Sequence, residues 1–451
     1  MNRRKLEQFL YIKIQINMNI LIENGLILTM TAAKDSANII FKGSIVIEGN
    51  NIKMVTDDHS KIEDFKHAHK TDITVIDASG KIVMPGLINA HTHVAMALLR
   101  SISDDVPLME WLNQHIWPIE GKMTSSDILI GAKLGILEMM LGGTTTFVDM
   151  YPYEEVVAEA AEFAGIRAVV SPCAMDFRMS HFEEDWKAVN KRFSDSSLVK
   201  IAVGPHAIYT CSDENMKRAV SLSRESGSII HIHHSETADE DHIVREKYGI
   251  NPTEYLLKAG VLERPTLAAH CVYMSDSDIE IFAKKSVSVA YNPQSNMKLS
   301  SGIAPISRML SRGVNVAIGT DGAASNNDLD MWEELRTASL LQKVATKDPC
   351  VLPAYQVLRM ATVNGARAIG MEGKLGVIAN GALADVIMID INKPHMFPHT
   401  NLISELVYSC KASDVDTVII NGKIVVEDGK CISMNSDTIC NEAQNHLELL
   451  W

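Results

Sequence analysis

The middle of the chain alternates short apolar runs with longer stretches of helical spacing, and this alternation constrains the fold more than any other feature. The runs have the length of buried strands, and the stretches that follow, such as 125–141, 213–226 and 276–285, have the period of amphipathic helices. Eight runs occur, at 82–88, 144–148, 168–171, 200–203, 229–232, 266–269, 287–290 and 314–318. Eight strand–helix units predict an α/β fold of the (β/α)8 barrel type. The alternative, an open doubly wound sheet, needs fewer strands, and the sequence lacks a Gly-x-Gly-x-x-Gly or Walker loop.

Both ends of the chain have the pattern of β-strands instead. Short β-branched runs lie at 19–28, 43–48, 51–55 and 74–77, and again at 384–390, 415–421 and 423–427. Because the termini of a domain usually lie close together, we expect the two sets to pair in one small β-sandwich. The expected organisation is an extension at 1–17, the N-terminal part of the sandwich at 18–80, the barrel at 81–374, and the C-terminal part with a tail at 375–451.

Charge and cysteine content limit the compartment and the partners. The net charge of −14 disfavours nucleic acid or an anionic membrane surface as a partner, because both are themselves negatively charged. The seven cysteines are odd in number and contain no Cys-x-x-Cys pair, which favours free thiols in a reducing, cytoplasmic environment. The sequence contains no run of 18 apolar residues, so it predicts no membrane-spanning helix. A homo-oligomer is compatible with the sequence, which leaves the oligomeric state open.

Histidine or aspartate follows five of the eight predicted strands. Barrel enzymes place their active groups at this end of the strands, so these side chains are expected to face one cavity. The residues are His91 and His93 after the first strand, His206 after the fourth, His233 after the fifth, His270 after the sixth and Asp321 after the eighth. A single His-x-His pair on a strand is more often structural than ligating. It is the occurrence of histidine or aspartate at five strand ends together that favours a shared site.

Three histidines and one carboxylate have the composition of a catalytic site for a divalent ion, with Zn²⁺ as the expected metal. Such an ion lowers the pKa of bound water to about 7 and supplies hydroxide at neutral pH. Glu236 lies three residues beyond His233 and is well placed to act as a general acid or base beside the metal. Taken alone, Glu236 is better interpreted as a solvated carboxylate, because the segment that follows it is acidic.

Several of these segments resemble the amidohydrolase superfamily. They are 85–93 (PGLINAHTH), Gly204-Pro205-His206, 233–237 (HHSET), Ala269-His270-Cys271, 292–296 (NPQSN) and 319–327. Within the superfamily the chain is most similar to the 5′-methylthioadenosine/S-adenosylhomocysteine deaminases, with the 5′-deoxyadenosine deaminases as near relatives. The resemblance runs from about residue 18 to about residue 428. It implies hydrolytic deamination of an adenosine-type nucleoside to the inosine analogue and ammonia.

Carried over residue by residue, the resemblance assigns roles to the site. The implied metal ligands are His91, His93, His233 and Asp321, the implied catalytic residues are Glu236, His270 and Asp321, and the implied substrate contacts are Trp111, Glu120, His206, Glu236 and Asp321. Glu236 is expected to carry a proton to ring nitrogen N1, and His270 to orient the attacking water. Binuclear relatives bridge two metals through a lysine at the end of the fourth strand, where this chain has His206, so one ion per chain is expected.

One departure bears on the substrate. Members that favour S-adenosylhomocysteine are expected to carry an arginine near the end of the third strand, for the amino-acid carboxylate. This strand ends in Ser171-Pro172-Cys173-Ala174, and Arg178 is the nearest substitute. The departure favours smaller 5′-substituents, methylthio or deoxy.

Two other classes of function remain open at this point, another hydrolase of the same scaffold and a non-catalytic binding protein. The scaffold also carries s-triazine chlorohydrolases, guanine deaminases and cyclic amidases, against which only the sugar-binding pair Trp111 and Glu120 argues. Without the resemblance, Trp111 reads as a core residue and Glu120 as a solvated one. A non-catalytic binding protein that keeps the barrel is disfavoured, because it predicts lost ligands and all of them are present.

Overall fold

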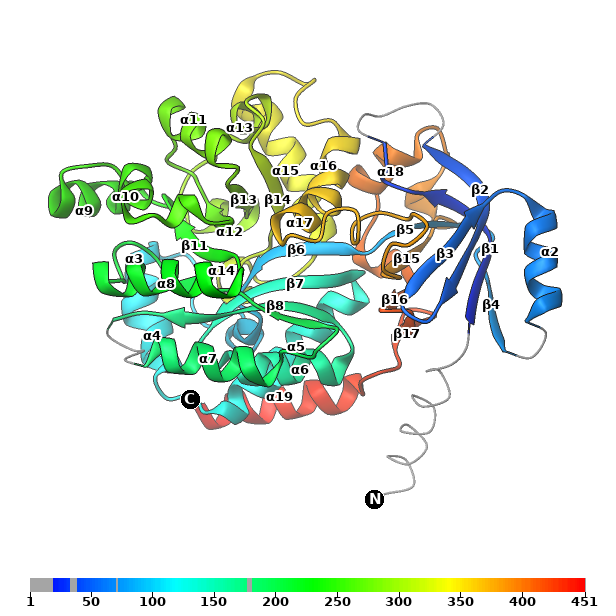
Figure 1. Ribbon diagram of the computed structural model, residues 1–451, viewed down its shortest axis with the longest axis horizontal. Helices are drawn as coiled ribbons and strands as arrows, with labels where there is room; N and C mark the ends of the chain where they lie inside the picture. Colours follow the sequence, from blue (N-terminus) through cyan, green and yellow to red (C-terminus); the bar gives the residue numbers. More distant parts are fainter. Residues whose placement is uncertain (1–18, 33–38, 70–71, 177–180, 451) are drawn as a thin grey trace.

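The computed structural model describes residues 19–32, 39–69, 72–176 and 181–450. The expected extension at 1–17 and the candidate substrate residue Arg178 lie outside these ranges. Parallel strands and helices alternate through the middle of the chain, as expected of an α/β fold, and strands from both ends lie together at one side (Figure 1).

The terminal strands form one nine-stranded sheet. Its members are β1 (Asn19–Leu28), β2 (Ile40–Glu48), β3 (Asn51–Thr56), β4 (Ile73–Asp77), β5 (Lys81–Pro85), β15 (Val386–Asp390), β16 (Val415–Ile420), β17 (Lys423–Glu427) and β18 (Lys430–Cys431). The order is β18-β17-β16-β15-β5-β1-β2-β3, with β4 paired to β1. The antiparallel pairing of β5 with β15 joins the two ends of the chain. Apolar residues of both halves, among them Ile22, Ile45, Met388 and Ile419, pack in one cluster.

The central strands form two sheets in which every pair is parallel. The first contains β6 (Leu87–Thr92), β7 (Thr144–Tyr151), β8 (Arg167–Ala174), β9 (Val199–Ile201) and β10 (Gly204–Pro205); the second contains β11 (Ile230–His234), β12 (Thr266–His270), β13 (Ser288–Tyr291) and β14 (Asn315–Ile318). Two isolated parallel bridges, Thr92 with Asp321 and Val203 with Ile230, connect one sheet to the other at both edges. The strand ends that carry the candidate residues therefore lie next to one another.

The first predicted run, 82–88, is two strands rather than one. It divides at Gly86 into β5, which belongs to the terminal sheet, and β6, which begins the central strands. The amide of Gly86 donates to Asp385 O, and a Cβ at this position would lie 2.1 Å from the side chain of Thr145. Only glycine fits where the backbone passes this close to a neighbouring strand. The Pro85-Gly86 pair is a local sign of such a division, but the apolar residues on both sides of it read as one buried strand.

Most of the helices cover the central strands, whereas α2 (His59–Ala68) packs on the terminal sheet, where Ile62 lies in one apolar cluster with Leu21 and Val46 (Figure 1). Those that follow in the chain are α3 (Leu108–Glu110), α4 (Trp117–Glu120), α5 (Ser125–Leu141), α6 (Glu154–Ala164), α7 (Phe182–Arg192), α8 (Asp213–Ser226), α9 (Ala238–Tyr248), α10 (Pro252–Ala259), α11 (Asp276–Lys285), α12 (Pro293–Lys298), α13 (Ile306–Ser311), α14 (Ala323–Asn326), α15 (Met331–Thr346), α16 (Ala354–Met360), α17 (Val363–Ala368), α18 (Leu402–Tyr408) and α19 (Ser436–Leu450). Local sequence starts several of them. Ser275 and Asp278 form a reciprocal capping box at the start of α11, which satisfies two amides that the helix leaves free.

The helix α19 lies along α5 on the outside of the molecule (Figure 1). Its His446 Nδ1 donates to Asp127 Oδ1 at 2.6 Å, which ties the last helix to the start of α5. The sequence predicted only a tail here. All seven cysteines are free. No helix within the described ranges combines the length and the apolar character that crossing a membrane requires.

Candidate metal and nucleoside site

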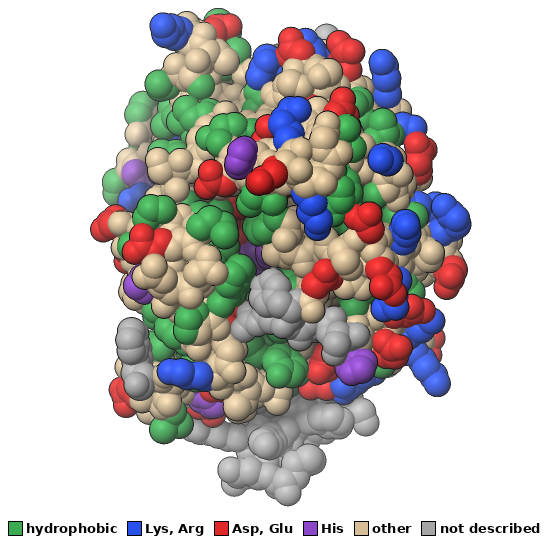
Figure 2. Space-filling model, turned by 90° about the vertical axis from the view of Figure 1, so that its left-hand side faces the viewer, with side chains coloured by type: hydrophobic (Ala, Val, Ile, Leu, Met, Phe, Trp, Pro, Cys, Tyr) green, Lys and Arg blue, Asp and Glu red, His purple; other side chains and the backbone are tan. Residues whose placement is uncertain are grey.

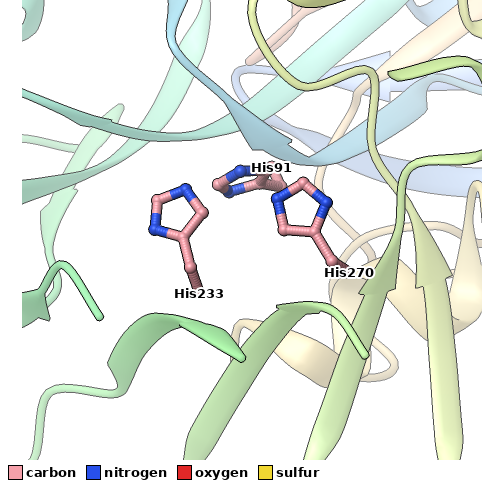
Figure 3. Close-up of side chains that lie close together, drawn as sticks. All are labelled: His91, His233 and His270. Carbon is pink, nitrogen blue, oxygen red and sulfur yellow. The ribbon is translucent and has the colours of Figure 1, made fainter. Parts of the chain in front are cut away.

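The candidate ligands converge from three strand ends. His91 lies on β6 and His93 directly after it, His233 lies on β11, and Asp321 follows β14. The His91 and His93 imidazoles are brought to the same side because side chains alternate along a strand. The bridge between Thr92 and Asp321 places the aspartate between the two histidines. Figure 3 shows the rings of His91 and His233 directed toward one another, with the ring of His270 beside them.

The distances among these groups fit a bound cation. Asp321 Oδ1 lies 3.4 Å from His91 Nε2 and 3.2 Å from His93 Nε2, and His93 Nε2 lies 3.2 Å from His233 Nε2. The Nε2 atom of His91 is buried and has no hydrogen-bond partner among the described residues. A buried, unpartnered ring nitrogen is costly unless something accepts its lone pair. The residues present therefore fit a divalent ion held by imidazole and carboxylate.

The backbone fixes the tautomers of two of these histidines. Nδ1 of His93 donates to Met150 O at 2.6 Å, and Nδ1 of His233 donates to His206 O at 2.8 Å. A neutral imidazole carries one hydrogen, so Nε2 of each ring is left as a lone pair facing the cluster.

Asp321 and His270 both have left-handed backbone conformations, with φ of 64° and 71°. Such values cost free energy in residues other than glycine and concentrate at functional sites. The second carboxylate oxygen of Asp321, Oδ2, accepts hydrogen bonds from the hydroxyls of Ser295 at 2.7 Å and Ser325 at 3.1 Å. The carboxylate is therefore held in one orientation from both sides.

His270 is oriented as a donor toward the same space. The amide of Asn296 donates to its Nδ1 at 2.9 Å, which leaves the hydrogen of the neutral ring on Nε2. That Nε2 lies 3.8 Å from Glu236 Oε2 and 4.0 Å from Asp321 Oδ2. His270 also lies close enough to His91 and His233 to be a ligand by distance alone. Its hydrogen-bond pattern instead favours donation to a molecule bound between it and the two carboxylates.

Glu236 is buried rather than solvated, with 8% of its surface exposed. The hydroxyl of Ser301 donates to its Oε1 at 3.2 Å. Burial raises the pKa of this carboxyl above its ordinary value, although the nearby His270 opposes the shift. A raised pKa is what a carboxyl needs to deliver a proton near neutral pH. The reading of Glu236 as a solvated loop residue is thus wrong.

A largely apolar cavity opens above the cluster. It is lined by His93, Met96, Leu108, Trp111, Leu112, Ile116, Trp117, Glu120, Met150, Tyr151, Pro152, Cys173, Met175, His206, Tyr209, His233, Glu236, His270, Leu299, Asp321 and Ser325. The side of the molecule drawn in Figure 2 is hollowed near its centre, with histidine at the bottom and hydrophobic side chains around it. Three sequence-predicted substrate contacts, Trp111, Glu120 and His206, therefore share one cavity with three of the four predicted ligands, His93, His233 and Asp321.

Each of these three side chains is held by a neighbour. The Trp111 indole N–H donates to Ser103 O at 3.2 Å, and His206 Nδ1 lies 2.9 Å from Thr210 Oγ1. The hydroxyl of Tyr151 donates to Glu120 Oε1 at 2.6 Å. Sequence reasoning missed Tyr151, because a tyrosine at the end of a buried strand carries no distinguishing pattern.

Comparison with known proteins supports the same reading. The sequence pattern of the amidohydrolase family matches residues 82–425. A 5-methylthioadenosine/S-adenosylhomocysteine deaminase from Pelotomaculum thermopropionicum is 45% identical over 94% of this chain and 97% of its own. A 5′-deoxyadenosine deaminase from Methanothermobacter thermautotrophicus is 46% identical over 87% of this chain and 91% of its own.

Among solved structures, a zinc-bound adenosine deaminase from Xanthomonas campestris is similar over nearly its whole length. It superimposes with a TM-score of 0.90 at 32% identity, covering 96% of this chain and 98% of its own. Sequence pattern, relatives and fold agree, and the chain belongs to the amidohydrolase family.

Proposed function

We propose that this protein hydrolyses the 6-amino group of an adenosine-type nucleoside, releasing ammonia and the inosine analogue. The observation that carries the proposal is the meeting of two sets of residues in one cavity. The first set consists of His93, His233 and Asp321 with Glu236, and the second of the Trp111 indole and the Glu120 carboxylate, which together suit a sugar. His91 lies within ligand distance of the first set. The names of the relatives point to the same reaction.

His91, His93, His233 and Asp321 would hold one divalent ion, with zinc as the candidate that the Xanthomonas structure suggests. When bound, such an ion acidifies water and supplies a nucleophile at neutral pH. The ordered second partners of these side chains support the assignment, since ligating histidines generally donate their other ring N–H to a fixed acceptor.

The remaining groups would move the protons of the reaction. Addition of water at C6 breaks the aromaticity of the ring, so N1 must gain a proton, and buried Glu236 is placed to give it. The Nε2–H of His270 would hold the attacking oxygen in line. Of the two protons that the water loses, one would go to Glu236 and replace the proton given to N1, and Asp321 would take the other and pass it to the departing amine. Both carboxylates lie within 4.0 Å of His270 Nε2, which puts donor and acceptors around one small volume.

Glu120 would accept hydrogen bonds from the two vicinal ribose hydroxyls, and Trp111 would offer a flat apolar wall. The Tyr151 hydroxyl holds one oxygen of Glu120 and so orients the carboxylate. His206 would contact the base or sugar from the other side. The described residues that line the cavity include neither lysine nor arginine, which supports a neutral 5′-substituent, methylthio or hydrogen, over a homocysteine carboxylate.

We also infer that the two parallel sheets form one closed eight-stranded barrel, in which β9 and β10 are two parts of one strand because both pair with β8 in the same register, and that the terminal sheet folds on itself as a β-sandwich. The bridges at both sheet edges support the first inference, and the single apolar cluster shared by β1, β2, β15 and β16 supports the second. The domains proposed are 18–85 with 375–451 for the sandwich and its tail, and 86–374 for the barrel. The expected boundary at 80 moves to 85 because β5 belongs to the terminal sheet.

An ammonia-release screen with adenosine, 5′-deoxyadenosine, 5′-methylthioadenosine and S-adenosylhomocysteine tests the function. We expect 5′-deoxyadenosine and 5′-methylthioadenosine to give the highest kcat/KM. Absence of ammonia from all four nucleosides, with metal bound, would refute the proposal. A preference for S-adenosylhomocysteine would refute only the substituent assignment, and an Arg178→Ala variant that lost that preference would identify the cation responsible.

A further inference from the structure

His91 differs from the other two imidazoles of the cluster in what holds it. His93 and His233 each donate from Nδ1 to a backbone carbonyl. Nδ1 of His91 lies instead 2.8 Å from Nε2 of His231, a second histidine two residues before His233 on β11. A side chain, rather than the backbone, therefore sets the orientation of His91.

His231 is in turn held on its other side. Its Nδ1 lies 3.0 Å from the hydroxyl oxygen of Ser171 on β8. His91, His231 and Ser171 thus form one continuous chain of polar contacts across β6, β11 and β8, and all three side chains have 0% exposure. In barrels, alternate strands contribute the side chains of one interior layer, which is the relation among these three strands.

The hydrogens of this chain can be assigned from chemistry. If Nε2 of His91 is left as a lone pair toward the cluster, its Nδ1 must carry the hydrogen of the neutral ring. Nδ1 then donates, and Nε2 of His231 must accept. The hydrogen of His231 consequently lies on Nδ1, which donates to Ser171 Oγ. This assignment gives one donor and one acceptor to each of the two contacts and leaves free the His91 Nε2 atom that has no partner among the described residues.

We propose that His231 is a positioning residue for the metal site, which fixes the tautomer and ring orientation of His91, with Ser171 fixing His231 in turn. The inference rests on the proposed function insofar as that function needs a bound metal. His231 reaches the ion only through His91. Partners of this kind typically contribute 10–100-fold to metal affinity. A substitution cannot remove the backbone carbonyls that hold His93 and His233, but it can remove the His231 side chain that holds His91.

The test compares His231→Leu with His231→Gln in the full-length protein, measuring Zn²⁺ affinity by competition with a chromophoric chelator. Leu removes the acceptor, and we expect affinity to fall about 10–100-fold. Gln places a carbonyl oxygen near the position of Nε2, so most of the affinity should be kept. A role in packing alone predicts the reverse order, because Leu is apolar and Gln adds a polar amide to a buried site. Co²⁺ absorption spectra should likewise change in the Leu variant and stay near wild type in the Gln variant.

His234→Leu is the matched control. His234 is an equally buried histidine on β11, but it contacts Thr253 and Ser235 rather than a ligand, so Zn²⁺ affinity should be unchanged. Unchanged affinity in folded His231→Leu would overturn the proposal. If His231→Leu does not fold, Ser171→Ala is tested in its place, because it leaves both histidine rings intact. Wild-type Zn²⁺ affinity in Ser171→Ala would also overturn the proposal. Wild-type protein that binds zinc but deaminates no nucleoside would refute the proposed function while leaving this inference to its own result.

Discussion

At the scale of single residues, the site depends on side chains whose surroundings restrict them to one orientation. Asp321 is held by two serine hydroxyls, and His270 by the amide of Asn296. The sequence predicted the acidic and histidine members, because strand ends in a barrel converge. It did not predict the serine and asparagine partners, since short polar residues beside a strand end are equally common in turns. Their role becomes apparent only from distances.

Replacing Glu236 with Gln should lower kcat about 10²–10⁴-fold, because the variant keeps the size of the side chain and loses the proton that N1 needs. Zn²⁺ content and KM should stay close to wild type, since Glu236 is not among the proposed ligands. Steady-state kinetics of ammonia release together with metal analysis measure both quantities.

Asp239→Asn provides the control for that loss. It removes an exposed carboxylate from the same acidic segment, and its kcat should be unchanged. Turnover near the wild-type value in metal-loaded Glu236→Gln would exclude Glu236 as the acid and require another group.

At the scale of elements, the terminal sheet and the central strands meet at a buried ion pair. Arg167 at the start of β8 contacts both oxygens of Asp385, at 2.7 and 3.1 Å, and Asp385 precedes β15 by one residue. Asp385 also accepts the backbone amide of Asn421 at 2.8 Å. The strand runs themselves were readable from the sequence, and the Pro85-Gly86 pair marks the division that the prediction missed. The contact of Arg167 with Asp385 was not readable, because it joins residues 218 positions apart, which local pattern does not encode.

Asp385→Ala should destabilise the protein by about 3–5 kcal/mol, because it leaves the guanidinium of Arg167 buried without its counter-ion. Urea unfolding followed by tryptophan fluorescence measures the change. The matched control is Asp241→Ala, which breaks an exposed pair with Arg245 and should cost about 0–1 kcal/mol. Equal losses in the two variants would show that the buried pair does not hold the two parts together.

At the scale of the whole molecule, the proposed ligands join both parallel sheets. His91 and His93 come from the first, while His233 and Asp321 come from the second. A bound ion would therefore connect strands that the isolated bridges connect only weakly. The pairing of the chain ends followed from their matching strand patterns, whereas the packing of α19 on α5 was not predicted.

Protein purified without chelator should contain about one equivalent of divalent metal per chain. Because the ion binds the folded state, Zn²⁺ should stabilise the apoprotein by about 2.7 kcal/mol when free zinc is 100 times the Kd. Metal analysis and thermal unfolding of chelator-treated protein with and without added zinc measure these effects. Two tightly bound equivalents would contradict a mononuclear site, and a Tm indifferent to zinc would contradict an ion that spans the sheets.

The pairing of β5 with β15 also sets an order on the synthesis of the protein. At about 5–20 residues per second, the roughly 300 residues between these strands take about 15–60 s to leave the ribosome. During that interval β5 can pair with β1, but its other edge, with unpaired amides and carbonyls, has no partner from the same chain. The free edge of β5 therefore stays unpaired while all the central strands are synthesised. A holding chaperone acting on the ribosome-bound chain would be most useful after residue 85 and dispensable once β15 has emerged.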